Sequence, residues 1–380
     1  MENILILGAT GFIGRNLVTH LRADHPDAAI RAVDKKHWKL VNMSAGHEVG
    51  FIHEGTTFVQ ADLSKERSMA KAFNRDDGKA WDLVVNLTTE SSHGASAGVY
   101  EERCCKVSVN CAKAAAGAAA TPGLYVDFST ALVYASGHRH AATEDSPLKP
   151  WTAEAVYQRA GEEAVAALNL PLNRVVFRPA YVYGRGDTTS IMPRAVCAAT
   201  YAGSQEVMKF LWDGSLKLNT VHVDDVCRAV VHAYVHKEKV GEMVFNLSDG
   251  GDTDQQLVNE LLGTVFDIKV GFVGRLISNV ARINLEGVAG AANEKHVEPW
   301  GKLCKEHDVN CVLTPFIHAE LLGNNHLFVN GGRFCEETGF VYEVPRLDEG
   351  RVKEMLWDAV DNKMFPNLDC LKGEGDGGRK

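Results

Sequence analysis

The stretch Ile4-Leu5-Ile6-Leu7-Gly8-Ala9-Thr10-Gly11-Phe12-Ile13-Gly14 decides the fold of this chain. Its four leading aliphatic residues indicate a strand, and a helical pattern follows from Ile13 to Leu21. Gly8 permits a tight turn after the strand, Gly11 leaves room for a phosphate against the backbone, and Gly14 allows the helix to pack closely on the strand. Free N–H groups at the helix start would face the phosphate charge. The stretch therefore predicts a strand–turn–helix unit that binds a pyrophosphate.

An acidic residue stands where such a unit needs one. Asp34 ends the second predicted strand, 30–33, about 20 residues beyond Gly14, where its carboxylate would accept hydrogen bonds from an adenosine ribose. The same charge would repel a 2′-phosphate, which favours NAD over NADP, although Lys35 and Lys36 weaken this preference. A glycine-rich turn that binds nothing is the alternative. The predicted cofactor-binding residues of this unit are Gly8, Thr10, Gly11, Phe12, Ile13, Gly14 and Asp34.

Strand-like and helical stretches alternate through the first half of the chain, whereas the second half is less regular. Further strands are predicted at 57–59, 83–87, 124–128, 174–177, 219–223 and 243–247. Further helices are predicted at 66–73, 99–119, 152–168, 255–265 and 351–360. This rhythm is typical of a parallel sheet between helices. We predict an α/β, Rossmann-like parallel sheet flanked by helices, with a smaller C-terminal lobe over a cleft at the carboxyl ends of the strands.

The domain boundaries are expected to follow this pattern. The dinucleotide-binding domain should span residues 1–185, with residues 215–248 returning to it. Residues 186–214 and 249–370 should form the smaller substrate lobe. The glycine-rich, polar residues 371–380 are expected to be a disordered tail.

Composition bounds the function further. The net charge of −9, without a basic stripe, argues against a nucleic-acid partner. No apolar run approaches the roughly 20 residues that span a bilayer, and Met1-Glu2-Asn3 leaves no room for a leader before the first strand. Nine scattered cysteines and the motif His138-Arg139-His140 lack the spacing of a metal site, so the motif is expected to be an exposed loop. We expect reduced thiols, no metal and a cytoplasmic location.

Four further segments follow predicted strands in a fixed order: Ala61-Asp62-Leu63, Asn86-Leu87-Thr88-Thr89-Glu90, Phe177-Arg178-Pro179-Ala180-Tyr181-Val182-Tyr183-Gly184-Arg185-Gly186-Asp187 and Val221-His222-Val223-Asp224-Asp225-Val226. With the glycine-rich turn, they resemble the extended short-chain dehydrogenase/reductase family, which contains nucleotide-sugar epimerases and dehydratases. The resemblance covers about two thirds of the chain. It implies that Asp62 and Leu63 contact the adenine. It also implies cofactor contacts for Asn86, Thr88 and Arg178.

For catalysis, the resemblance implies a hydroxyl after the fifth strand and a tyrosine on the following helix. Ser129-Thr130-Ala131-Leu132-Val133-Tyr134 matches the first element. Thr130 is therefore expected to hydrogen-bond the reacting group while Tyr157 transfers the proton and contacts the cofactor. The family's 4,6-dehydratases and decarboxylases carry acidic residues directly after that threonine. Ala131 and Leu132 argue against both activities.

The family's lysine, four residues after its tyrosine, is missing from the expected position. In Val156-Tyr157-Gln158-Arg159-Ala160-Gly161 a glycine stands there. Arg159 lies two residues after Tyr157, on the opposite helical face, and is a poor substitute. An unassisted tyrosine phenol has a pKa of about 10, so it carries protons poorly near neutrality.

Two functions stay open. In the first, the chain is an NAD-dependent enzyme resembling nucleotide-sugar epimerases and reductases, with Thr130 and Tyr157 at an atypical active site. In the second, it is a catalytically inactive nucleotide-binding protein with a structural or regulatory role. The expected partner is a small-molecule substrate such as a nucleotide sugar. The resemblance also allows a homodimer through the two long helices of the dinucleotide-binding domain.

Overall fold

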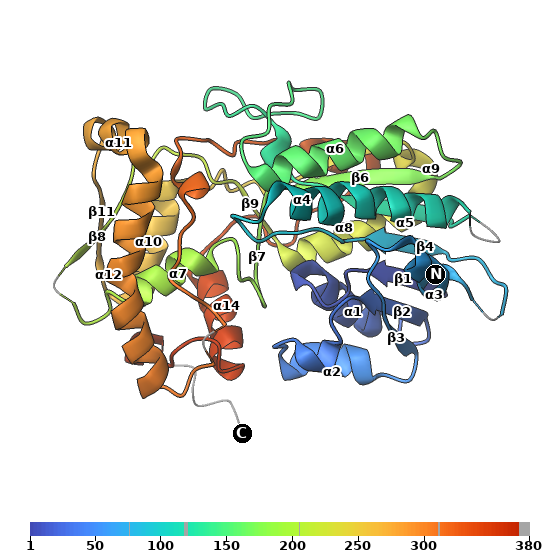
Figure 1. The fold of residues 1–380 in the computed structure, drawn as a ribbon, viewed down its shortest axis with the longest axis horizontal. Coiled ribbons are helices and arrows are strands. Elements are labelled where there is room, and N and C mark those ends of the chain that lie inside the picture. Colours follow the sequence, from blue (N-terminus) through green and yellow to red (C-terminus); the bar gives the residue numbers. More distant parts are fainter. Residues whose placement is uncertain (76, 118–120, 205, 311, 372–380) are drawn as a thin grey trace.

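The computed structural model describes residues 1–75, 77–117, 121–204, 206–310 and 312–371 (Figure 1). In this part of the chain, seven parallel strands form a large sheet in the order β10-β6-β5-β4-β1-β2-β3. The predicted fold class, a Rossmann-like parallel sheet flanked by helices, is therefore confirmed. The strands are β1 (Asn3–Leu7), β2 (Ala29–Asp34), β3 (Thr56–Gln60), β4 (Leu83–Asn86), β5 (Leu124–Phe128), β6 (Arg174–Pro179) and β10 (Met243–Leu247).

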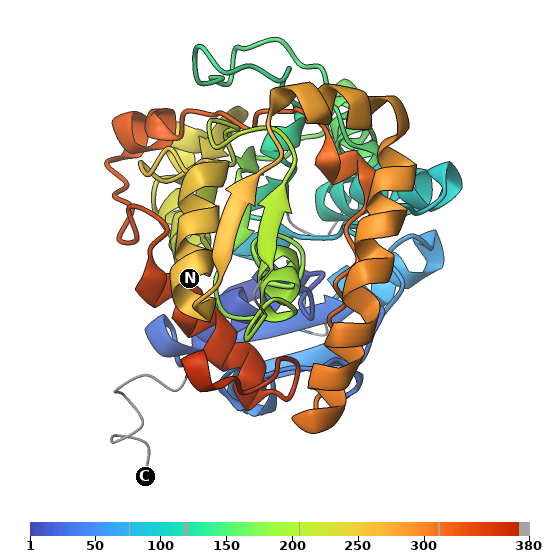
Figure 2. The same cartoon turned by 90° about the vertical axis from the view of Figure 1, so that its left-hand side faces the viewer.

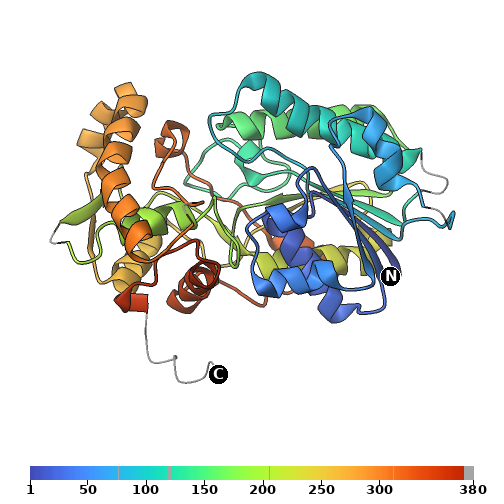
Figure 3. The same ribbon diagram turned by 60° about the horizontal axis from the view of Figure 1, so that its bottom comes forward.

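Helices cover both faces of the large sheet (Figure 3). Ile4 and Ile6 of β1 pack in the core under one helix layer, whereas Leu5 and Leu7 pack under the other. Successive side chains of a strand point to opposite faces, so a strand covered on both sides needs an apolar residue at every position. One face carries α1 (Phe12–Asp24), α2 (Ala45–Ile52) and α8 (Val223–Val235), and the other carries α3 (Met69–Phe73), α5 (Val107–Ala116) and α6 (Ala153–Ala167).

The two strands predicted in the second half belong to different sheets. β10 joins the large sheet beside β6. β9 (Thr220–His222) instead pairs with β7 (Tyr181–Tyr183), which the sequence does not predict. A further short pair, β8 (Val207–Phe210) and β11 (Lys269–Phe272), lies in the smaller lobe. Short strands of three or four residues carry too little pattern to be found from the sequence.

The smaller lobe has an apolar core of its own. It lies to the left of the large sheet in Figure 1. The helices that supply the core are α7 (Met192–Ala199), α10 (Gln255–Phe266), α12 (Leu285–Glu306) and α14 (Glu349–Asp361). The sequence predicts α10 and α14 but not α12, which contains Pro299.

One segment of the predicted smaller lobe packs on the large sheet. α13 (Gly332–Thr338) carries Phe334, which is fully buried. Its ring lies 5.3 Å from that of Phe177 in β6 and 5.1 Å from that of Phe245 in β10. The lobe boundary of 249–370 stays a prediction, but α13 within it packs on the large sheet. Aromatic packing between distant segments leaves no local pattern in the sequence.

The helix beside α6 contains a π-helical turn. α4 (Ala97–Tyr100), the π-helical segment η3 (Glu101–Lys106) and α5 form one continuous helix. The predicted helix 99–119 is thus present to residue 116, and residues 118–120 lie outside the described residues. A Cβ atom on Gly161 of α6 would lie 3.2 Å from the Cys104 carbonyl oxygen in η3. Gly161 therefore allows the two helices to approach closely.

The remaining elements are short. Among the described residues, no helix has both the length and the apolar character needed to cross a bilayer. Leu371, the first residue of the predicted tail, is buried, and residues 372–380 lie outside the described part of the chain. The short helices are α9 (Lys237–Val240), α11 (Arg275–Ala281), η1 (Trp38–Leu40), η2 (Glu66–Ser68), η4 (Ala131–Val133), η5 (Arg282–Asn284), η6 (Ala319–Leu322) and η7 (Asp369–Leu371).

Candidate functional site

Two adjoining cavities follow the carboxyl ends of the strands in the large sheet. The first cavity has a volume of about 470 Å³ and the second about 250 Å³. Gly8, Gly11, Leu87 and Thr89 line both of them, so the cavities form one groove across the glycine-rich turn. This edge of a parallel sheet is where ligands bind in such folds.

The glycine-rich turn between β1 and α1 forms the floor of the groove. Gly8 has a φ of +79°, and a Cβ atom there would lie 2.8 Å from the Leu87 carbonyl oxygen. A Cβ atom on Gly14 would collide with the Gly8 carbonyl oxygen. Gly11 caps α1 without a side-chain acceptor, so the first N–H groups of the helix stay available to an anion. As predicted, Gly8, Thr10 and Gly11 line the first cavity, and Phe12, Ile13 and Gly14 line the second.

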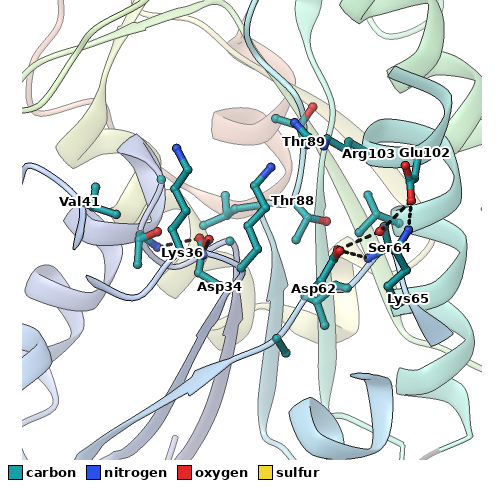
Figure 4. A pocket seen from close by; sticks show the side chains of 18 residues that line it. Asp34, Lys36, Val41, Asp62, Ser64, Lys65, Thr88, Thr89, Glu102 and Arg103 are labelled. Atoms are coloured by element: carbon teal, nitrogen blue, oxygen red, sulfur yellow. Dashed lines mark hydrogen bonds and ion pairs between the residues drawn. The ribbon is translucent and has the colours of Figure 1, made fainter. Parts of the chain in front are cut away.

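Asp34 and Lys36 stand on one side of the first cavity (Figure 4). The Asp34 carboxylate accepts hydrogen bonds from the backbone N–H groups of Thr10 at 3.1 Å and Lys36 at 3.0 Å. These bonds fix the carboxylate between β2 and the glycine-rich turn. Lys35 lines the same cavity. One carboxylate and two ammonium groups therefore surround this end of the groove.

A polar network closes the opposite side of the first cavity (Figure 4). Asp62 accepts hydrogen bonds from the N–H group of Ser64 at 3.1 Å and from its hydroxyl at 2.8 Å. Partial burial acts to raise the pKa of Asp62, but the Ser64 bonds and the nearby Lys65 outweigh it and lower the pKa. Ser64 and Lys65 also contact Glu102 of η3. Of the predicted residues, Asp62, Leu63 and Thr88 line this cavity.

Asn86 and Arg178 lie behind the cavities and line neither of them. The Asn86 amide donates to Asp127 at 3.0 Å and accepts from the Thr88 hydroxyl. Arg178 donates to both carboxylate oxygens of Glu162 on α6, at 3.1 and 2.6 Å. Both side chains are buried, and buried polar groups need partners inside the protein. They hold the strands and α6 in place. Their predicted cofactor contacts stay a prediction.

α6 presents Glu154 and Gln158 to the second cavity. The two residues are four apart and share one helical face. Gln158 Nε2 donates to Glu154 Oε1 at 2.8 Å and to Thr89 Oγ1 at 2.9 Å. Glu162, four residues further, completes the stripe and pairs with Arg178. The spacing is that of the family's tyrosine–lysine pair, but a carboxyl and an amide occupy it.

Tyr157 is directed away from this cavity. Its ring stacks on that of Tyr100 in α4, with centroids 5.9 Å apart and an interplanar angle of 14°. Tyr157 lines neither cavity, so the structure does not bring it to the predicted place beside cofactor and substrate, and its catalytic role stays a prediction. Successive residues of an α-helix are rotated by about 100°, so the neighbour of Gln158 points elsewhere. Thr130, in contrast, lines the second cavity, at its predicted position.

The Glu154 carboxyl holds its proton more tightly than an ordinary glutamate. Removal from water raises its pKa to about 7, the nearby His93 opposes this shift, and the charges of Glu320 and Glu90 add to it. His93 also lines the second cavity, and its Nδ1 atom lies 3.5 Å from a carboxylate oxygen of Glu320. A group with a pKa near 7 can both accept and donate a proton at neutral pH.

Four buried polar atoms around the second cavity have no hydrogen-bond partner among the described residues. They are His93 Nδ1, Ser129 Oγ, Gln158 Oε1 and Ser190 Oγ. Buried polar atoms almost always have a partner in native proteins. Their concentration around one cavity indicates a polar ligand.

A small third cavity of about 70 Å³ continues into the smaller lobe and shares Tyr181, Thr189 and Ser190 with the second. Arg194 lines it, with its guanidinium carbon 4.9 Å from the Phe210 ring centroid. The guanidinium donates to Gln255 at 3.2 Å, and in the described part of the chain no carboxylate pairs with it. Desolvation lowers the pKa of Arg194. The aromatic residues of this cavity are Trp151, Tyr181, Phe210 and Trp212.

Sequence reasoning misses Glu154, Gln158, His93 and Arg194. A signal for the first two is present, because polar residues recur at positions 154, 158 and 162 within the predicted helix and must form one stripe. The resemblance instead directs attention to Tyr157, which lies on another face of the same helix. His93 and Arg194 belong to segments without a local motif, and only the chain's path brings them to the cavities.

Comparisons with known proteins agree with this geometry. Low-salt glycan biosynthesis protein Agl12 from Haloferax volcanii is 24% identical over 254 residues, which cover 65% of this chain and 77% of that protein. The fold is similar to that of UDP-glucuronic acid 4-epimerase from Bacillus cereus in complex with UDP-glucuronic acid and NAD, with a TM-score of 0.66. That comparison covers 94% of this chain and 99% of the epimerase at 14% identity.

A second solved structure gives the same result. The dTDP-glucose 4,6-dehydratase from Bacillus anthracis in complex with NAD has a TM-score of 0.67 at 17% identity, over 96% of this chain and 98% of that one. The sequence model of the NAD dependent epimerase/dehydratase family matches residues 4–248, more than half of the chain. The resemblance to extended short-chain dehydrogenases/reductases is thereby confirmed, and the chain belongs to the NAD-dependent epimerase/dehydratase family.

Proposed function

We propose that this protein is an NAD-dependent enzyme that oxidises or isomerises a nucleotide sugar, with Glu154 as the proton acceptor and donor. One observation carries the proposal: a carboxyl with a pKa of about 7 lines the cavity that continues the glycine-rich groove. Perturbed pKa values concentrate at functional sites. The family supplies the reaction class, and Glu154 supplies the proton transfer.

The groove fits a dinucleotide. Gly8, Gly11 and Gly14 keep the turn free of side chains, and the uncapped start of α1 offers N–H donors to a pyrophosphate. The first cavity, with Asp34 and Asp62, would hold the adenosine end, and the second would hold the nicotinamide end. When bound, NAD would accept a hydride from the substrate and return it.

The chain's own residues would manage the proton. The Thr130 hydroxyl would hydrogen-bond the reacting oxygen of the substrate. Ionised Glu154 would accept the proton of the reacting substrate hydroxyl while a hydride leaves the carbon that carries this hydroxyl. In the reverse step Glu154 would return the proton. A phenol needs a neighbouring cation to ionise near neutrality, whereas a carboxyl with a pKa near 7 does not. Glu154 with Gln158 would therefore replace the tyrosine–lysine pair by different chemistry.

We further propose NAD rather than NADP as the cofactor. The Asp34 carboxylate is held at the cavity by two backbone N–H groups and would accept hydrogen bonds from the ribose hydroxyls. A 2′-phosphate would meet this negative charge at short range. Lys35 and Lys36 line the same cavity and limit the preference.

The substrate proposal rests on the second and third cavities. Arg194, without a carboxylate partner among the described residues, would pair with the diphosphate of a nucleotide sugar. The aromatic walls around it suit a stacked base. Substitution Arg194→Met should weaken nucleotide-sugar binding by roughly tenfold to a hundredfold, because a charge-assisted bond contributes about 1.5–3 kcal/mol. NAD affinity, measured by calorimetry, should not change.

A catalytically inactive NAD-binding protein is the alternative. Gln158 favours it, because the family's lysine provides a cation beside the nicotinamide ribose and a glutamine amide does not. Such a protein would still bind NAD through the glycine-rich turn. Its role would be structural or regulatory.

Turnover and binding measured together separate the two functions. A panel of nucleotide sugars with NAD should reveal NADH formation or an isomerised product in the wild type. Glu154→Gln should reduce turnover by a factor of roughly 100 or more while NAD affinity is kept. Glu163→Gln, on the exposed face of the same helix, is the matched control. NAD binding without any turnover in wild type or variant establishes the inactive protein.

A further inference from the structure

The helix α11, at the outer end of the smaller lobe, buries a serine and exposes its aliphatic residues. Ser278 is fully buried. Leu276, Ile277 and Val280 are exposed to 86%, 62% and 69%. A surface helix normally turns its apolar side to the core and its polar side to water. The orientation of α11 is the reverse.

The apolar stripe continues beyond α11. Ile283 of η5 is 86% exposed. Residues 276, 280 and 283 follow the helical spacing i, i+4 and i+7, so their side chains lie along one face. Single exposed aliphatic residues are common on protein surfaces. Four on two consecutive helical turns form a patch, which we call the α11 stripe: Leu276, Ile277, Val280 and Ile283.

The smaller lobe holds the α11 stripe in this orientation. The Ser278 hydroxyl accepts a hydrogen bond from the Trp212 backbone N–H at 2.6 Å and donates to the Gly274 carbonyl at 2.8 Å. Trp212 has a φ of +68°, a left-handed conformation that is costly for a bulky residue. Its indole donates to the Leu322 carbonyl at 2.8 Å. The exposed stripe is thus fixed by specific bonds and a strained residue.

Three cationic residues flank the α11 stripe although the whole chain has a net charge of −9. Residues 268–285 contain no aspartate or glutamate, but they contain Lys269, Arg275 and Arg282. All three cationic residues are exposed. Arg275 forms one ion pair, with Asp213 of the same lobe. This end of the molecule is therefore both apolar and basic.

The motif His138-Arg139-His140 extends the basic surface. It is exposed, as the sequence predicts, and the His138 ring lies 5.2 Å from that of His326. Burial lowers the pKa of His326, the charges of His138 and Arg275 lower it further, and Asp213 opposes them, so the motif and α11 both act on His326. Both lie at the upper end of the molecule in Figures 1 and 2. Of the two acidic residues of this loop, Glu144 accepts a hydrogen bond from the Asn246 N–H, and the exposed Asp145 lies 4.0 Å from Arg333.

We propose that this surface docks the protein on an anionic lipid bilayer. The α11 stripe would enter the boundary between headgroups and acyl chains, and Arg139, Arg275 and Arg282 would meet the lipid phosphates. Aliphatic residues flanked by cations are the features by which helices lie on anionic membranes. Charge complementarity favours this occupant over a second copy of the chain, which would bring the same cations together.

Vesicle co-sedimentation of the full chain tests the proposal. Wild-type protein should bind phosphatidylcholine vesicles that contain phosphatidylglycerol more strongly than pure phosphatidylcholine vesicles. Leu276→Ser with Ile283→Ser should lower the partition coefficient by roughly tenfold or more, because less aliphatic surface would be transferred from water into the bilayer. Val235→Ser with Val341→Ser removes two residues of similar exposure, 70% and 69%, outside the lobe and should have no effect. Arg282→Gln should weaken only the anionic binding, by about fivefold.

Two results would overturn the proposal. In the first, the wild type and the Leu276→Ser/Ile283→Ser variant have the same partition coefficient, and neither protein distinguishes anionic from neutral vesicles. The other is the absence of vesicle binding together with self-association that the α11 variant abolishes, which would assign the stripe to a second copy. Neither result bears on NAD binding or turnover, so the test is independent of the proposed function.

Discussion

The two ends of the groove are built in different ways. The floor of the first cavity consists of backbone groups, namely the glycine-rich turn and the start of α1. Side chains make the second end, where Glu154, Gln158 and Thr130 face the cavity. The first end carries the predicted glycine pattern at Gly8, Gly11 and Gly14, whereas the second presents Glu154 and Gln158 to the cavity at i, i+4 spacing. A site made of backbone tolerates the divergence of its neighbours, so cofactor binding and proton transfer can change independently.

The largest effect should come from the backbone-built end. Gly11→Asp adds a Cβ atom 3.2 Å from the Gly8 carbonyl oxygen and sets a negative charge against the pyrophosphate. Because the helix start attracts anions through its N–H groups, a carboxylate there should abolish NAD binding in a calorimetric titration. Gly98→Asp on α4, where a Cβ atom meets nothing within 4 Å, is the matched control. NAD heat that survives in Gly11→Asp would contradict the assignment of the groove.

The next effect concerns the replaced pair. Gly161→Lys, which the family pattern suggests as a repair, should lower the free energy of unfolding by about 2 kcal/mol. Its side chain would press on the η3 backbone, and overpacking costs typically 1–3 kcal/mol. NAD binding should not improve. Gly98→Lys, on an exposed site of α4, should be neutral or slightly stabilising in the same urea titration. A stable Gly161→Lys variant with tighter NAD binding would restore the Tyr157 hypothesis.

A smaller effect should appear in the dependence of stability on pH. The folded pKa of Glu154, about 7, lies above the ordinary glutamate value, so the folded protein binds this proton more tightly than the unfolded chain. Its contribution is therefore lost as pH rises from about 5 to above 7. Glu154→Gln should be more stable than wild type at pH 8 by an amount on the order of 1 kcal/mol, discounted because water reaches the cavity. Parallel melts at pH 5 and pH 8 that show no such difference would contradict the raised pKa of Glu154.

The smallest effect should be on dinucleotide choice. Asp34→Asn keeps an acceptor for the Thr10 N–H and removes the charge. The preference for NAD over NADP should narrow by about fivefold, which corresponds to about 1 kcal/mol. Competitive titration measures it, with Lys36→Gln expected to shift the ratio in the opposite direction. Tighter NADP than NAD binding by the wild type would show that Lys35 and Lys36 dominate.

Much of the large sheet can be predicted from the sequence. Its central strands β1 and β4 are nearly continuous apolar runs, because helices cover both faces, and β1 to β6 and β10 lie where the pattern puts them. The smaller lobe is harder. α12 contains Pro299, and β7 and β8 are too short to show a period. α13 packs on the large sheet through Phe334, whose ring contacts those of Phe177 and Phe245.

The sequence by itself determined the cofactor end of the site. Gly8, Gly11 and Gly14 are required by the turn itself, and contacts among near neighbours are encoded locally. Only the tertiary structure decided which side chains face the second cavity. A rotation of about 100° per residue separates Tyr157 from Gln158 on α6, and the ion pair between Glu162 and Arg178 fixes which of them faces the cavity. The pKa of Glu154 likewise depends on His93, Glu320 and burial, which arise from segments far apart in the chain.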